Sequence, residues 1–306
     1  MDAMIGNLRE VDIKRLRIFM TIVESGGFVQ AQNELGLSAS TISVRMAELE
    51  SSLGLTLCHR GRSGFAVTAE GQAVYQACQG LLLSHEKFIS SIGAIKGEIS
   101  GELRLGTIDN VIFDPNLPLS QALADFYRQA TELEISLYTM APSELQRAVL
   151  DQKLHLGIGV FYHRVPGLDY LPICTERLVL YCASGHPLFR EQETALTVEQ
   201  LADAGYIERT YGLTTSRLNR PVRLQPAAYS SSLEATALLI QTGQYIGFLP
   251  PYYARKLGDQ PQLKPLLPEQ VYIESEVSAV VRKNQQDDVV VRQLLDSLQA
   301  AMTASG

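Results

Sequence analysis

Residues 28–68 read FVQAQNELGLSASTISVRMAELESSLGLTLCHRGRSGFAVT and decide the fold of the N-terminal part of the chain. The stretch predicts two short helices joined by a tight turn, followed by a hairpin. Gly36 stands where the first helix must end, because a residue without a Cβ turns at little cost. Ser38 then caps the second helix by accepting from its first free N–H groups. Apolar residues of the second helix recur at three- and four-residue steps and point inward: Ile42, Met46, Leu49 and Leu53.

The outer face of the second helix is short and polar, which suits a helix laid in the major groove of DNA. Two arginines at the hairpin tip, Arg60 and Arg62, can grip phosphates or enter the neighbouring minor groove. We therefore expect contacts to double-stranded operator DNA from Arg60, Arg62 and the helix residues Ser38, Ala39, Ser40, Thr41, Ser43, Val44 and Arg45.

A set of residues between positions 16 and 71 has specific spacings: Leu16, Phe19, Val23, Gly26, Phe28, Ala31, Leu35, Ser38, Ser43, Leu49, Glu50, Leu53, Gly54, Leu57, Arg60, Thr68 and Gly71. Together they resemble the N-terminal signature of LysR-type transcriptional regulators. One departure is Ala39-Ser40, where the family often has Gln-Pro or Gln-Ser. Because the glutamine that commonly reaches a base is missing, we expect base contacts from Ser40, Thr41, Val44 and Arg45.

The composition indicates that the DNA-contacting stretch, residues 28–68, belongs to a larger acidic chain. A chain of 306 residues with 46% hydrophobic residues allows roughly two folded domains. The net charge of −7 and the pI near 5.3 argue against nonspecific nucleic-acid binding by the whole chain. The sequence has no apolar run of a membrane span and no secretory signal at its start, so we expect a cytoplasmic protein without a membrane partner.

The pattern of residues 69–96 predicts a long helix with one apolar stripe, which has to pack against another element to be buried. The stripe consists of Val74, Ala77, Leu81, His85, Phe88, Ile92 and Ile95. A second copy of the helix is the simplest partner for this stripe, and the resemblance likewise implies a dimerising linker helix. The resemblance further implies a homotetramer built as a dimer of dimers, and contact with RNA polymerase. A dimer would place two recognition helices on two half-sites of a palindrome.

The predicted order of domains is a winged helix-turn-helix over 1–68, the linker helix over 69–96, a hinge over 97–101 and a body over 102–306. Strand and helix patterns alternate in the body, which favours α/β layers with parallel sheets. The elements suffice for two lobes, about 102–173 with 271–306, and about 174–270.

The body also resembles the LysR effector domain, whose fold is similar to type 2 periplasmic binding proteins. This resemblance is carried by Gly101 and Gly106 with Thr107, by the Gly185-His186-Pro187-Leu188 turn, and by Gly243 with Gly247-Phe248-Leu249-Pro250. It implies two lobes with a cleft between them.

Polar residues at the ends of strands are candidates for an effector site, since ligands of open α/β sheets lodge there. By resemblance they line an inducer pocket: Thr107, Asp109, Asn110, Ser143, Phe161, Glu208, Arg209, Thr210 and Tyr211, with Tyr162 beside Phe161. Ser143 and Ser232 are expected to cap helices. An acidic and a basic residue together, Glu208 and Arg209, favour a small amino- or hydroxy-carboxylate as the effector.

Three alternatives stay open at this stage. An enzyme is disfavoured, because the five histidines are scattered and no catalytic frame occurs. Cys174 and Cys182 lie eight residues apart inside strand-like sequence and allow a thiol-based redox sensor. The cysteines form no C-x-x-C pair and no His cluster accompanies them, so we expect neither a metal nor another cofactor. A cytoplasmic solute-binding protein with an incidental helix pair is the third alternative.

Overall fold

The computed structural model describes residues 10–59, 64–95, 99–191, 196–210, 217–219, 223–258, 261–283, 285 and 288–305. The chain divides into two compact units, Met1–His85 and Glu86–Gly306. Each unit has its own hydrophobic core and is described separately below.

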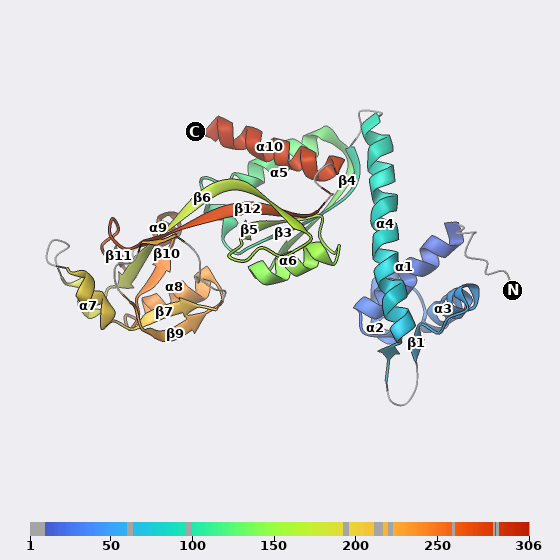
Figure 1. Cartoon of the computed structure of the whole chain (residues 1–306), viewed down its shortest axis with the longest axis horizontal. Coiled ribbons are helices and arrows are strands. Elements are labelled where there is room, and N and C mark those ends of the chain that lie inside the picture. Colours follow the sequence, from blue (N-terminus) through green and yellow to red (C-terminus); the bar gives the residue numbers. More distant parts are fainter. Residues whose placement is uncertain are drawn as a thin grey trace. The chain divides into compact units, whose positions relative to one another are not determined.

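The first unit is a helical head with a short hairpin. Its elements are α1 (Glu10–Glu24), α2 (Phe28–Leu35), α3 (Ala39–Leu53), β1 (Cys58–His59), β2 (Ala66–Val67) and the first part of α4 (Ala69–Ile95) (Figure 1). Gly36 ends α2 with a left-handed φ of 62°, and Ser38 caps α3 by accepting from the Thr41 N–H at 3.2 Å. β1 and β2 pair antiparallel, so the predicted winged helix-turn-helix is confirmed.

Side chains from all of its helices form the core of the first unit. Phe19, Ile42 and Met46 are almost fully buried, from α1 and α3. From α4, Tyr75 enters the same core, and its hydroxyl donates to the Glu24 carboxylate of α1 at 2.7 Å. The first turns of the long helix are therefore part of the head.

Thr68 and Gly71 fix the point where the hairpin passes into α4. The Thr68 hydroxyl donates to the Thr56 carbonyl at 2.7 Å and accepts from the Gly71 N–H at 2.8 Å, so Thr68 caps α4. Gly71 lies so close to the hairpin that a Cβ on it would stand 2.0 Å from the Leu57 carbonyl oxygen. A side chain at this position would push the hairpin away from the helix.

The later turns of α4 expose apolar side chains. Phe88 is 62% exposed, and Ile92 and Ile95 are exposed as well. These residues continue the stripe that begins with Val74 and Leu81, which pack against the core of the head. The apolar stripe of α4 is therefore packed against the head in the first turns of the helix and exposed in the later turns.

The second unit contains the following strands: β3 (Ile99–Thr107), β4 (Ala130–Thr139), β5 (Leu156–Val160), β6 (Leu168–Ala183), β7 (Tyr206–Arg209), β8 (Arg217–Asn219), β9 (Pro226–Ser230), β10 (Gly247–Leu249), β11 (Leu263–Pro265) and β12 (Tyr272–Arg282). Its α-helices are α5 (Leu119–Gln129), α6 (Pro142–Leu150), α7 (Val198–Ala202), α8 (Leu233–Gln241), α9 (Pro251–Lys256) and α10 (Val289–Ser305). Two short 3-10 helices are η1 (Val111–Phe113) and η2 (Pro187–Phe189).

The predicted hinge over 97–101 is wrong in its second half. Ile99, Ser100 and Gly101 already belong to β3 and pair with β4, while residues 96–98 lie outside the described part of the chain. Ser100 and Gly101 suggested a flexible linker. The hydrogen bonds between β3 and β4 are made by the backbone, however, and they tolerate small side chains near the end of a strand.

The main sheet has the strand order β10-β6-β12-β5-β3-β4 and is mixed. β3 pairs parallel with β4 and β5, and β7 pairs parallel with β9 in a separate sheet, as predicted. The expectation of parallel sheets is wrong elsewhere, because β12 returns antiparallel to both β5 and β6. The sequence pattern did not show this return, since a buried strand reads alike in either direction.

β6 and β12 run side by side through both lobes of the second unit (Figure 1). β6 is one continuous strand of 16 residues that passes through Pro172. Along β6 the contacts change from one core to another between Cys174 and Leu178, and along β12 they change between Ile273 and Val277. The register of the pair shifts between Val277 and Ser278, so an irregularity lies at this crossing.

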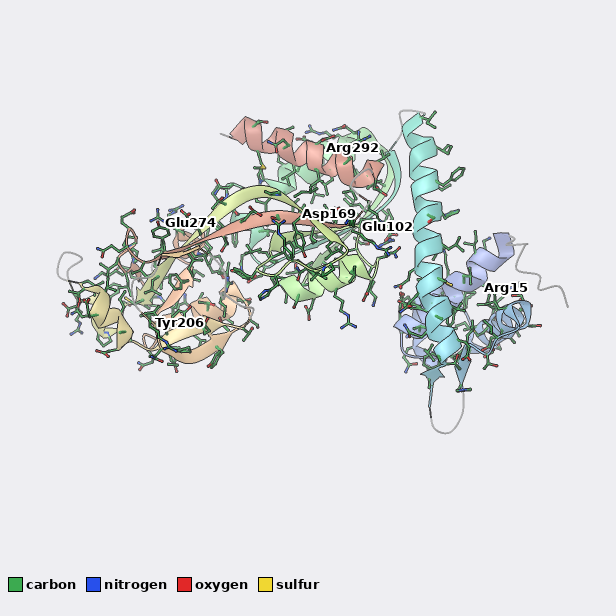
Figure 2. The ribbon with its side chains drawn as sticks, viewed as in Figure 1. Arg15, Glu102, Asp169, Tyr206, Glu274 and Arg292 are labelled. Atoms are coloured by element: carbon green, nitrogen blue, oxygen red, sulfur yellow. The ribbon has the colours of Figure 1, made fainter. Side chains whose placement is uncertain are left out.

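In the first lobe, α5 and α10 cover one face of the sheet and α6 covers the other (Figure 1). Alternate residues of β12 show the two faces: Val277 and Ala279 pack under α5 and α10, whereas Val280 packs under α6. In the second lobe, α8 packs on β6 and β10. Tyr206 of β7 is fully buried there, with its ring edge against Phe248 (Figure 2).

Replacing Gly71 with alanine tests the junction between hairpin and α4. We expect Gly71→Ala to lower the free energy of unfolding by about 1–3 kcal/mol, because the new Cβ overlaps the Leu57 carbonyl. Gly80→Ala is the matched control: Gly80 is in the same helix with nothing within 4 Å of its Cβ position, so this variant should gain about 0.5–1 kcal/mol. Urea titrations followed by circular dichroism measure both; equal effects of the two variants would contradict the close contact.

Candidate functional site

α3 presents the predicted DNA-reading face to solvent. Ser38, Ser40, Thr41, Val44 and Arg45 are exposed. The other two predicted contact residues, Ala39 and Ser43, are half-buried and turn partly toward the core. The exposed part of this face therefore coincides with the residues expected to replace the missing glutamine.

Hydroxyl groups at the start of α3 are linked to each other. The Ser38 hydroxyl lies 2.9 Å from the hydroxyls of both Ser40 and Thr41, in addition to capping the helix. These contacts limit the rotamers of the exposed serine and threonine. Because these side chains have few rotamers in the free protein, they lose little conformational entropy when they contact a base edge, which favours selective contacts.

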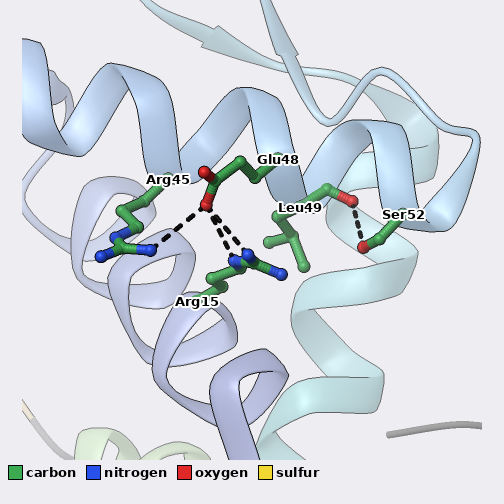
Figure 3. Close-up of polar contacts among 5 residues, drawn as sticks. All are labelled: Arg15, Arg45, Glu48, Leu49 and Ser52. Atoms are coloured by element: carbon green, nitrogen blue, oxygen red, sulfur yellow. Dashed lines mark hydrogen bonds and ion pairs between the residues drawn. The ribbon is translucent and has the colours of Figure 1, made fainter. Parts of the chain in front are cut away.

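Glu48 holds two arginines at the middle of α3 (Figure 3). Its Oε2 atom lies 3.0 Å from Arg15 Nη2 of α1 and 3.3 Å from Arg45 Nη1. Arg15 is mostly covered, whereas Arg45 is 46% exposed. An exposed pair of this kind contributes about 0–1 kcal/mol, so Arg45 can exchange Glu48 for a DNA group at little cost.

The wing is fixed to α3 by Glu50. The Glu50 carboxylate accepts from the backbone N–H groups of Leu57 and Cys58, at 2.7 and 3.3 Å. The wing base therefore has a fixed position relative to the recognition helix. Arg60 and Arg62, predicted at the wing tip, lie outside the described residues, and their role stays a prediction.

A cleft opens between the two lobes of the second unit. Its unoccupied volume is about 480 Å³, which includes its open mouth. The first lobe contributes most of the apolar wall. From the second lobe, β7 and α9 contribute the polar side chains of Arg209 and Tyr252, and α8 contributes the apolar Leu233. The lining residues are Ile108, Asp109, Val111, Asp114, Leu117, Pro142, Val160, Tyr162, Glu176, Arg209, Leu233, Tyr252 and Val277.

Asp109 connects the two lobes across this cleft. Its Oδ2 atom accepts from the Leu233 N–H in the first turn of α8 at 2.6 Å, and from the Asn110 side-chain amide at 2.8 Å. The N-terminus of a helix favours negative charge, so this contact stabilises the lobes in the present arrangement. Ser232 caps the same helix through its hydroxyl, as predicted.

Two further carboxylates lie in the cleft with little exposure. Glu176 is 8% exposed and accepts from the Tyr252 hydroxyl at 2.6 Å; Asp114 is 7% exposed and accepts from the Asn116 N–H at 2.9 Å. Burial raises the pKa of both carboxyls, and the negative charges of Asp114 and Asp109 raise that of Glu176 further. The Arg209 guanidinium acts in the opposite direction on Glu176.

The sequence-predicted effector residues separate into two groups. Asp109 and Arg209 line the cleft, and Asn110 orients Asp109. Outside the lining are Thr107, Ser143, Phe161, Glu208 and Thr210; Tyr211 lies outside the described residues.

Two of these predictions are corrected by local geometry. Ser143 is not a cap, because α6 begins at Pro142 with Ala141 in the cap position, and Ser143 is exposed. Phe161 packs its ring edge against Tyr170 in the core beneath α6, while its neighbour Tyr162 faces the cleft. Neighbouring residues of an extended segment point to opposite sides, which explains why one of the two aromatic residues is in the pocket.

Sequence reasoning missed Asp114, Glu176 and Tyr252. Glu176 had a visible signal, since it is an acidic residue within the strand-like run Cys174–Ala183. Buried strands rarely carry an unpaired charge, so such a residue indicates a site. Asp114 and Tyr252 have no comparable local pattern.

Cys174 and Cys182 cannot form a disulfide with each other in this fold. Both are in the continuous strand β6, where eight residues span roughly 26 Å, far beyond the Cα separation of a disulfide. Burial raises the pKa of the thiols to about 12 for Cys174 and about 11 for Cys182. Both thiols therefore remain protonated and weakly nucleophilic near neutral pH.

The described part of the chain contains neither a metal site nor a membrane-spanning helix. No group of His, Cys, Asp and Glu residues there has an arrangement that could hold a metal ion. None of the described helices combines the length and apolar character needed to cross a lipid bilayer.

Two family models match consecutive parts of the chain. Residues 13–72 match the bacterial regulatory helix-turn-helix protein of the lysR family, and residues 96–303 match the LysR substrate binding domain. The HTH-type transcriptional activator BauR of Pseudomonas aeruginosa is 37% identical over 294 residues, which cover 96% of each chain. The HTH-type transcriptional regulator BenM of Acinetobacter baylyi is 26% identical over 194 residues, covering 63% of this chain and 62% of BenM.

Solved structures have the same fold. A full-length OxyR variant from Pseudomonas aeruginosa matches with a TM-score of 0.66 at 18% identity, covering 96% of each chain. Full-length CbnR complexed with its target DNA matches with a TM-score of 0.60 at 20% identity, covering 94% of this chain and 99% of CbnR.

A winged helix-turn-helix followed by a two-lobed unit with a ligand cleft defines a one-component transcription regulator. The chain belongs to the LysR family and is a LysR-type DNA-binding transcription regulator with an effector-binding domain.

Substitution of Arg45 tests the orientation of the recognition helix. We expect Arg45→Ala to weaken binding to the operator by about 1–3 kcal/mol and to lower the ratio of specific to nonspecific affinity, because Arg45 is exposed beside the base-reading positions. Arg62→Ala should weaken binding to all sequences alike. Arg147→Ala, which removes an 84% exposed charge from α6, is the control. Fluorescence anisotropy measures the ratio; an unchanged ratio for Arg45→Ala would mean that another face of α3 meets the bases.

Proposed function

We propose that this chain is a cytoplasmic regulator whose small-molecule effector binds in the cleft of the second unit and changes how a multimer holds operator DNA. The observation that carries the proposal is the presence, in one chain, of an exposed recognition face and a cleft lined by both charged and apolar groups. The family match supports both halves of this statement.

A small carboxylate with a second polar group is the effector that fits the cleft. Arg209 lies at the carboxyl end of β7, where it can receive the carboxylate. Asp109 occupies the N-terminus of α8, and Arg209, which has contacts of its own, supplies the positive charge of the described lining. The second polar group, amino or hydroxyl, would face the acidic side of the cleft. The apolar wall accommodates a short carbon chain.

Effector binding would act by shifting a population of lobe arrangements. A ligand that contacts both lobes favours the arrangement in which both contacts exist. Because β6 and β12 pass through both lobes, a change of angle between them bends this strand pair. In a multimer, such a change alters the spacing of the recognition helices along DNA.

Dimerisation through α4 follows from its uncovered apolar stripe. Phe88, Ile92 and Ile95 are exposed at three- and four-residue spacings, which suits packing against a second copy of the helix. We propose a dimer formed in this way and a tetramer built from two dimers. The structural neighbours BenM and CbnR are full-length regulators with the same fold, which is compatible with this assembly.

We further propose that the protein is not an enzyme and that it contacts RNA polymerase. The scattered histidines and the lack of a catalytic frame in the sequence support the first statement. The relative BauR is named a transcriptional activator, which supports the second, since activators commonly act on polymerase at the promoter.

Genomic footprinting tests the proposed function directly. We expect protected sites in intergenic regions, with two inverted half-sites about one helical turn or a multiple apart, because a symmetric dimer presents two copies of α3. The genes beside the sites should encode proteins that handle a small carboxylate. Protection without any shared sequence would contradict the assignment of α3 as a reading helix.

Charged substitutions on α4 test the dimer. We expect Phe88→Glu with Ile92→Glu to weaken dimerisation at least about a hundredfold, because two unpaired charges would be buried in the interface. Gln76→Glu, at an exposed polar position of the same helix, is the control. Light scattering coupled to size-exclusion chromatography gives the mass; a dimer that persists in the double variant would place the interface elsewhere.

A further inference from the structure

The cleft has an excess of negative charge for a site that receives a carboxylate. Among its described lining residues, three are carboxylates, Asp109, Asp114 and Glu176, and one is a guanidinium, Arg209. The location of the site rests on the cavity between the lobes and on the family match. The charges decide which kind of molecule can occupy it.

Asp109 is already committed to contacts within the protein. Its carboxylate accepts from Leu233 N–H and from the Asn110 amide, and it faces the positive end of the α8 dipole. The negative charge of Asp109 is therefore balanced without a ligand. Two carboxylates, Asp114 and Glu176, remain for the single described guanidinium of the lining.

Glu176 and Asp114, which both line the cleft, are held in place by hydrogen bonds. Tyr252 donates its hydroxyl to Glu176 from α9 of the second lobe, and Asn116 donates its N–H to Asp114 in the first lobe. Neither residue is more than 8% exposed, so neither can turn out into water without a rearrangement. Burial raises the pKa of both carboxyls, and the charge of Asp114 raises the pKa of Glu176 further, so a cation placed between them stabilises their ionised forms.

A hydroxyl group and an ammonium group differ in what they offer to this pair. A hydroxyl donates one hydrogen bond and leaves the excess negative charge in place. An ammonium group donates three hydrogen bonds and also places a positive charge beside the two acids, so an amino acid adds no net charge to the cleft, whereas a hydroxy acid adds one negative charge. The aromatic rings of Tyr162 and Tyr252, which line the same cleft, are compatible with a neighbouring cation.

We propose that the effector is a small amino acid in its zwitterionic form, with its ammonium group held by Glu176 and Asp114 and its carboxylate held by Arg209. This inference rests on the proposed function and narrows the amino- or hydroxy-carboxylate to the amino class. The apolar residues Val111, Leu117 and Val277 then enclose the short carbon chain between the two charged ends.

The test uses the full-length protein and matched pairs of ligands in isothermal titration calorimetry. The pairs are alanine with lactate, β-alanine with 3-hydroxypropanoate, and γ-aminobutyrate with 4-hydroxybutyrate, and propanoate is the plain acid. We expect one amino acid to bind at least about tenfold more tightly than its hydroxy partner, because a buried charge-assisted hydrogen bond is lost in the partner.

Variants separate this inference from the proposed function. Glu176→Gln keeps the contact with Tyr252 and should abolish the preference for the amino acid, whereas Glu269→Gln, at an 84% exposed carboxylate, should preserve it. Equal or tighter binding of a hydroxy acid or of propanoate overturns the inference and leaves the proposed function standing. No binding of any of these acids overturns the inference and counts against the proposed cleft ligand as well. A preference that survives in Glu176→Gln also overturns it.

Discussion

The second unit depends on one constraint: β6 and β12 pair with each other through both lobes. Each strand leaves one hydrophobic core and enters the other, so the lobes cannot separate without breaking this ladder. The register shift beside Val277 lies where the strands pass between the cores, and such irregularities bend a strand pair. The crossing therefore joins the lobes while allowing the angle between them to change, which a regulator with a ligand between its lobes requires.

The same crossing explains the chemistry of the cleft. Glu176 and Val277 belong to the crossing strands, so the floor of the cleft carries a buried carboxylate beside an apolar wall. Asp109 bridges to the first turn of α8, and it lines the same cleft as Glu176 and Val277. In the first unit, Glu48 and Glu50 have an analogous role: one orients Arg45, and the other fixes the wing base. In both units, acidic residues position the groups that meet the ligand or the DNA.

Local signals explain which features the sequence could predict. Gly36 and Ser38 act through the backbone of their immediate neighbours, and the helix-turn-helix was predicted correctly from them. Arg209 and Asp109 could be placed in the cleft because strand ends meet there. Glu176 could not, since its position depends on its pairing with Ser275 in β12, far along the chain. Tyr252 reaches it from a third segment, and the continuity of β6 was hidden by Pro172 in its middle.

The central claim is that occupancy of the cleft changes how the recognition helices meet DNA. The most direct measurement is a footprint of the full-length protein on its operator, with and without the amino acid that binds most tightly, for the wild-type protein and for Glu176→Gln. We expect the ligand to change the length or pattern of protection for the wild type and, at the same concentration, to leave the variant's footprint unaltered. An identical wild-type footprint with the cleft saturated would contradict the coupling between cleft and DNA.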